Sequence, residues 1–184
     1  MGINFAHQSS YTQTAPAGLL LHGVFDMDGS SSYTVSNLPT DAKFFRFSFK
    51  QVATNYSNNP RWNMRFGSAS ASSIDSDNNY RWCSGYYDSG NAGAGTNAAS
   101  SLEILNRNHT SSNHREHGVM DLARSSQGWT IRGQFGDHYY SPGINYNMTG
   151  VWMFDTSMSK VQLYSNGGQF RYDSELIVHY MMGN

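Results

Sequence analysis

The sequence predicts an all-β fold: a single-domain antiparallel β-sandwich, jelly-roll-like, with about ten strands. Short runs alternate apolar and polar residues at period two, which places one face of a strand in a core. Turn-forming Gly, Asn, Asp and Ser separate these runs at regular intervals. No long segment repeats its apolar residues at helical spacing. We assign residues 18–184 to the sandwich and the polar residues 1–17 to an extended N-terminal arm.

The first half of the sandwich contains the clearest alternation. Phe45, Phe47 and Phe49 share one face of a long run, and Trp62, Met64 and Phe66 share one face of the next. Residues 88–99 are rich in Gly, Ala and Asn, and they predict a flexible loop. The expected strands in this half are 19–25, 32–35, 42–52, 61–67 and 80–87.

The second half repeats the pattern with shorter runs. The polar residues 106–118 are expected to form the loop of a long hairpin between strands at 102–105 and 119–122. The Ser-Asn-Gly-Gly sequence at 165–168 predicts a tight turn within a final hairpin. The remaining expected strands are 129–135, 148–154, 161–164 and 175–180.

Length and composition exclude several classes of protein. A chain of 184 residues fits one domain that needs neither a disulfide nor a metal to fold. The net charge of −1 argues against a nucleic-acid binder or a binder of anionic membranes. Cys83 is the one cysteine, so no intrachain disulfide can form. No apolar window is long enough for a transmembrane helix, and no signal peptide is recognisable.

The C-terminal segment carries a spaced pattern of apolar, small and aromatic residues: Val161, Leu163, Ser165, Gly168, Phe170, Ser174, Leu176, Val178 and Tyr180. This pattern resembles the end of a family of small virion structural proteins of tailed bacteriophages. Asp173 stands where the family usually has Gly. Segments 33–39, 61–67 and 145–152 are similar to further family motifs and occur in the same order.

This resemblance implies a β-sandwich placed on the virion and no catalytic residues. We therefore expect a structural protein, not an enzyme, that needs no cofactor and is assembled in the host bacterial cytoplasm. It would decorate the capsid or form a knob, binding the major capsid protein or a tail component, with self-association considered as well. The alternative is a tail or adsorption module that binds a host glycan, marked by an exposed aromatic platform. A glycoside hydrolase would need a pair of carboxylates, and the few acidic residues are scattered.

Five tyrosines are the candidate partner-binding residues. Tyrosine anchors protein interfaces and stacks on sugar rings, although core packing is the commoner role of aromatic residues in strands. Tyr139 and Tyr140 precede Ser-Pro-Gly and mark the favoured contact loop. The full set is Tyr11, Tyr86, Tyr87, Tyr139 and Tyr140.

Three further patterns are weighed against simpler roles. His109, His114 and His117 with Glu116 could ligate zinc, but their spacing fits no standard motif, so a polar loop is favoured. Residues 26–29 and 75–78 resemble the start of a calcium loop without its later ligands, which favours plain turns. Cys83 lies in an aromatic strand, Tyr80-Arg81-Trp82-Cys83, which favours a buried structural thiol over a nucleophile.

Overall fold

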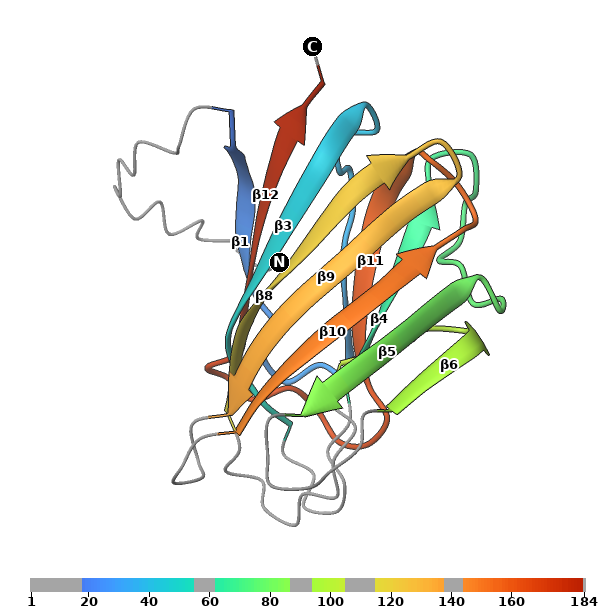
Figure 1. Ribbon diagram of the computed structural model, residues 1–184. Helices are drawn as coiled ribbons and strands as arrows, with labels where there is room; N and C mark the ends of the chain where they lie inside the picture. Colours follow the sequence, from blue (N-terminus) through green and yellow to red (C-terminus); the bar gives the residue numbers. More distant parts are fainter. Residues whose placement is uncertain (1–17, 55–61, 87–93, 105–114, 138–143, 184) are drawn as a thin grey trace.

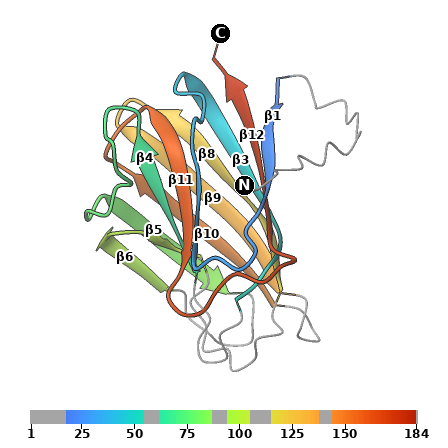
Figure 2. The same cartoon turned by 180° about the vertical axis from the view of Figure 1, so that it is seen from behind.

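The computed structural model describes residues 18–54, 62–86, 94–104, 115–137 and 144–183. These residues form twelve strands in two antiparallel sheets that face each other (Figures 1 and 2). The predicted β-sandwich is therefore confirmed, with more strands than the ten expected. The described segments contain no helix that could cross a membrane.

The larger sheet has eight strands and the smaller has four. In spatial order the larger sheet contains β1 (Leu20–Asp26), β12 (Glu175–Met182), β3 (Ala42–Val52), β8 (Glu116–Ser125), β9 (Gly128–Asp137), β10 (Ile144–Trp152), β5 (Tyr80–Tyr86) and β6 (Ala94–Ala99). The smaller contains β2 (Ser32–Val35), β11 (Met158–Ser165), β4 (Trp62–Ser68) and β7 (Leu102–Glu103). The pairs β1–β12, β2–β11, β5–β10 and β8–β9 are nested along the chain. This nesting gives the jelly-roll-like wrapping of the two sheets.

The core lies between the sheets and is built by the predicted alternation. The three inward phenylalanines of β3 are buried, as are the three large apolar residues of β4. Phe49 meets Trp62 with ring centroids 5.0 Å apart, and Phe47 meets Phe66 at 6.5 Å. Because β3 and β4 belong to different sheets, these ring contacts join the two layers.

Two predicted loops contain strands. Residues 94–99 form β6, which pairs with β5 at one edge of the larger sheet. Residues 116–118 begin the ten-residue strand β8. The expected hairpin between 102–105 and 119–122 is also wrong, because β7 pairs with β4 whereas β8 pairs with β3 and β9. Small and polar residues carry little alternation, so only backbone pairing identifies these strands.

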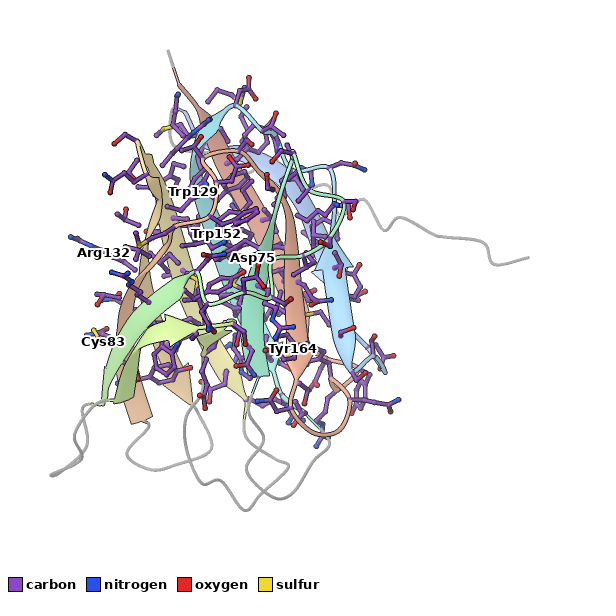
Figure 3. All side chains as sticks on the ribbon, turned by 90° about the vertical axis from the view of Figure 1, so that its right-hand side faces the viewer. Asp75, Cys83, Trp129, Arg132, Trp152 and Tyr164 are labelled. Carbon is purple, nitrogen blue, oxygen red and sulfur yellow. The ribbon has the colours of Figure 1, made fainter. Side chains whose placement is uncertain are left out.

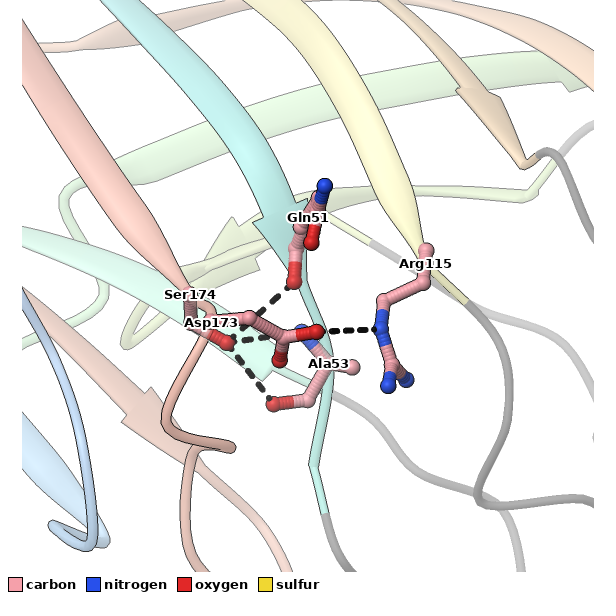
Figure 4. Close-up of polar contacts among 5 residues, drawn as sticks. All are labelled: Gln51, Ala53, Arg115, Asp173 and Ser174. Carbon is pink, nitrogen blue, oxygen red and sulfur yellow. Dashed lines mark hydrogen bonds and ion pairs between the residues drawn. The ribbon is translucent and has the colours of Figure 1, made fainter.

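The expected C-terminal hairpin is wrong for a related reason: β11 lies in the smaller sheet and β12 in the larger. The buried Ser174 fixes this crossing (Figure 4). Its Oγ accepts from the Ala53 N–H at 3.1 Å and lies 3.3 Å from the carbonyl oxygens of Gln51 and Ala53. Asp173 accepts from Arg115 Nε at 3.0 Å. Ser174 therefore holds the start of β12 against the end of β3, and Asp173 holds it against the residue that precedes β8.

A buried carboxylate fixes the end of β10. Asp75 accepts a hydrogen bond from Trp152 Nε1 at 2.7 Å, and both side chains lie inside the sandwich (Figure 3). Tyr80 is buried beside them, and its hydroxyl donates to the Asp75 carbonyl at 3.1 Å. Burial raises the pKa of Tyr80, so this hydroxyl remains a donor. Asp75, the first residue of the second segment that resembles a calcium loop, is a structural hydrogen-bond acceptor.

Candidate functional site

The outer face of the larger sheet carries the side chains that alternate with the core residues. On β8, β9 and β10 they form two rows across the strands. His117, Gly136 and Asn145 are register partners in the first row. Val119, Gln134 and Asn147 are register partners in the second.

These two rows line a hollow of about 710 Å³, which we call the amide hollow. Gly136 has no side chain between His117 and Asn145, which opens space in the first row. Phe135 and Tyr146 also line the hollow, although both side chains are buried. Their rings stack with centroids 5.0 Å apart. The rings therefore pack on the core side of the sheet, beneath the hollow.

The amide hollow presents side chains that can both donate and accept hydrogen bonds. Gln134 and Asn145 are exposed, and neither side chain makes a hydrogen bond within the described part of the chain. An amide group both donates and accepts, which matches the hydroxyl groups of a sugar. Asn147 and His117 are half-buried at the same hollow. The site is suited to holding a hydroxyl-rich ligand.

A third row continues along the face. It contains Asp121, Arg132, Thr149 and Cys83 as successive register partners. Figure 3 shows Arg132 and Cys83 on the side of the sheet away from Trp129 and Trp152. Arg132 therefore shares the outer face with the amide hollow.

Asp121 is already bound on its other side. Arg46 on β3 donates from Nε to one carboxylate oxygen and from Nη2 to the other, both at 2.7 Å. The hydrogen bonds to Asp121 raise the pKa of Arg46. His179 is the register partner of Arg46 on β12. Burial and then the charge of Arg46 lower the pKa of His179, so this imidazole is neutral at pH 7.

Cys83 is exposed, and the prediction of a buried thiol is wrong. Tyr80 and Trp82 face the core, and the alternation along β5 then turns Cys83 outward. Its Sγ lies 3.1 Å from Thr149 Oγ1. Trp82 is buried.

The five candidate tyrosines are not tested by this structure. Tyr86 is the last residue of β5 and pairs with Tyr146 through the backbone. The Tyr86 side chain lies outside the described residues, as do Tyr11, Tyr87, Tyr139 and Tyr140. Phe154 and Tyr172 are exposed aromatic residues in the described segments, and neither lines the amide hollow. The role of the five tyrosines in partner binding stays a prediction, as does that of the arm at residues 1–17.

Of the three candidate zinc-ligating histidines, the structure describes one. His117 lies on β8 and lines the amide hollow, whereas His109 and His114 fall outside the described residues. Within the described segments, no group of three His, Cys, Asp or Glu side chains is placed to hold a metal.

The first segment that resembles the start of a calcium loop contains a turn. Residues 27–30 form this turn, and Gly29 has a φ of 67°.

Sequence reasoning missed Arg132, Gln134, Asn145 and Asn147. Arg132 and Gln134 occupy outward positions in the predicted strand 129–135, whereas Asn145 and Asn147 precede the predicted strand 148–154. The period-two pattern therefore contained the direction of the two β9 side chains, but neither that of the two asparagines nor the neighbouring strands that gather all four.

No protein-family model and no curated protein matches the chain. Among solved structures, it is similar to the CBM2 module of the evolved Dit of phage J-1 from Lactobacillus casei BL23. The identity is 11%, the TM-score is 0.29, and the alignment covers 94% of each chain. Similarity at this level establishes neither a shared site nor a shared ligand.

Proposed function

We propose that this protein is a non-catalytic binding module of a tailed-bacteriophage particle, and that its amide hollow binds a carbohydrate of the host surface. The observation that carries this proposal is the convergence of Gln134, Asn145 and Asn147 from two adjacent strands around one hollow. Placement on a phage particle is supported by the C-terminal motif and its order with the three upstream segments. Glycan binding, the alternative drawn from the sequence, is thereby preferred to capsid decoration.

The lining of the hollow supports binding rather than hydrolysis. Glycoside hydrolysis uses two carboxylates on either side of the scissile bond. None of the described residues that line the amide hollow is acidic. Asp121 lies one row away, and both its oxygens accept from Arg46. A ligand in the hollow would meet amides, one imidazole and backbone groups.

A titration calorimetry experiment with polysaccharide purified from the host envelope tests the proposal. We expect a double variant, Gln134→Ala with Asn145→Ala, to lose about tenfold in affinity for each amide removed. The melting temperature should stay unchanged, because neither side chain bonds to the described part of the protein.

Gln162→Ala is the matched control for this experiment. Gln162 lies on β11 in the smaller sheet, and it bonds Thr34 at 3.4 Å in an exposed setting. This control should bind as tightly as the wild type. Equal losses in the control and the double variant, or no binding of wild type to any envelope polysaccharide, would refute the proposal.

A second candidate role, attachment to another protein of the particle, is favoured by an apolar strip on the opposite edge of the larger sheet. Leu20, Leu21 and Val24 of β1 are 50%, 58% and 53% exposed. Met181 and Met182 of the paired strand β12 are 39% and 38% exposed. Exposed apolar side chains gathered at one edge of a sheet are typical of a protein interface.

Copy-number measurement on purified particles tests this attachment. Copies that stay with DNA-filled heads would establish decoration of the capsid. Copies that follow the tails would establish an adsorption role. Absence of the protein from particles would refute both forms of attachment.

A further inference from the structure

The charges on the outer face of the larger sheet are unevenly distributed. On β1, β12, β3 and β8 the outward carboxylates are Asp26, Glu175 and Asp121, and the outward cations are Lys50 and Arg46. Lys50 bonds Glu175 at 2.6 Å, and Arg46 holds Asp121 as described. Each of these two cations has its own carboxylate.

On β9, β10 and β5 the outward charges are all positive among the described side chains. Arg132 on β9 and Arg81 on β5 are exposed, and no outward carboxylate accompanies them in the described part of these strands. Asp121 lies directly across from Arg132, but its two oxygens are occupied by Arg46. Arg132 makes no ion pair with any described residue.

Arg132 is also within reach of a ligand in the amide hollow. It precedes Gln134 by two residues on the same strand, which places the two side chains on one face about 7 Å apart. The planar guanidinium presents a fork of donors that matches phosphate and carboxylate oxygens. The whole chain has a net charge of −1, so any attraction of an anion here depends on local arrangement.

We infer that the ligand of the amide hollow is an anionic polysaccharide, whose phosphate or carboxylate groups are bound by Arg132. The amides of Gln134 and Asn145 hold the sugar hydroxyls, and Arg132 selects for the negative charge beside them. This inference rests on the proposed function, because it names the ligand class of the same site.

The test measures the affinity of wild type and variants for matched charged and neutral glycans. One arm uses a polyol-phosphate polymer and its dephosphorylated form, and the other uses a uronic-acid polymer and its carboxyl-reduced form. We expect wild type to bind at least one charged form about tenfold more tightly than its neutral counterpart. Arg132→Gln should abolish that preference and leave affinity for the neutral form unchanged.

Lys43→Gln is the control for net charge. Lys43 is exposed near the start of β3, two strands away from β9, and its replacement removes the same single charge. This variant should keep the full preference for the charged form. The arm in which the preference appears identifies the anionic group as phosphate or carboxylate.

Three results would overturn the inference. Equal affinity for charged and neutral glycans would refute the inference that the ligand is anionic, and it would leave the proposal of carbohydrate binding intact. Equal losses in Lys43→Gln and Arg132→Gln would show that net charge, not this site, attracts the ligand. Binding of duplex DNA as tightly as of the charged glycan would show that sugar hydroxyls are not required. Failure to bind any polysaccharide would instead refute the proposed function itself.

Discussion

The two halves of the outer face of the larger sheet are built on one continuous set of hydrogen-bonded strands, yet they present opposite chemistry. In the half formed by β1, β12, β3 and β8, apolar residues are exposed, and the cations Arg46 and Lys50 form ion pairs with carboxylates of the protein itself. The half formed by β9, β10 and β5 has exposed amides and two arginines without outward carboxylates among the described residues. The first half is suited to a protein surface and the second to a polar, anionic ligand.

The difference teaches that the pairing of a charge, more than its presence, decides whether it is available for binding. Arg46 and Arg132 flank the same aspartate on adjacent strands. Only Arg46 engages it, in a two-pronged contact, and so only Arg132 keeps its donors for a ligand.

The largest effect on glycan affinity is expected from a bulky side chain that covers the half formed by β9, β10 and β5. Thr149 is exposed on β10 between Arg132 and Cys83, and tryptophan is well tolerated in strands. We expect Thr149→Trp to weaken glycan binding about a hundredfold, equal to about 2.8 kcal/mol. Ile177→Trp on β12 should leave glycan affinity unchanged. Calorimetric titration of both variants checks this, and similar losses in both would remove the distinction between the halves.

The apolar half should respond to the complementary change. A double variant, Leu21→Ser with Val24→Ser, removes apolar surface worth at least about 1.5 kcal/mol if these residues are buried against a partner. Its occupancy on purified particles should fall by at least about tenfold. Glycan affinity should not change, and quantitative mass spectrometry of the particles provides the measurement. Unchanged occupancy would exclude this strip as the attachment surface.

Asp155 lies outside both halves, so its replacement should change the stability of the fold without changing glycan affinity. Burial opposes its charge, but hydrogen bonds from Ser68, the Ser157 N–H and Ser70 outweigh burial and lower the pKa of Asp155 to about 2. An ordinary aspartate titrates near 3.9. Because the folded pKa is the lower one, the stabilisation is fully present above about pH 4 and is lost as the pH falls toward 2.

Asp155→Asn should therefore destabilise the protein by about 1 kcal/mol at pH 6, a value reduced for solvent screening of this partly exposed group. The difference from wild type should vanish near pH 2. Urea unfolding across this pH range checks the sign, and a difference that persists at pH 2 would contradict it. Glycan affinity at pH 6 should be unaffected.

The smallest effect is expected from removing the ion pair between Arg46 and Asp121. Asp121→Asn releases Arg46, whose side chain is 41% exposed, and leaves two neighbouring cations without a carboxylate between them. Stability should fall by only about 0.5 kcal/mol, because a partly exposed ion pair contributes little. Affinity for an anionic glycan should rise about twofold through the added local charge. A fall in affinity would show that Asp121, rather than Arg132, helps to bind the ligand.

Several elements were determined by the sequence itself. Phe45, Phe47 and Phe49 predicted both the extent and the inward face of β3, because period-two alternation of large apolar residues has one stable solution in a half-buried strand. The two-layer all-β architecture followed from many such runs separated by turns. The polar outward position of Gln134 was also present in that pattern, whereas Asn145 lay outside the predicted strand 148–154.

Only the tertiary structure decided which of these residues meet. Gln134 and Asn145 come together because β9 pairs with β10 in one register, and a shift of one residue would turn one of them toward the core. The separation of β11 and β12 into different sheets, and the contact of Arg46 with Asp121 across 75 residues of chain, depend on the same long-range pairing. Local sequence fixes the direction of a side chain along its own strand. Which strand becomes its neighbour is decided by how the whole core packs, and the candidate site exists only at that level.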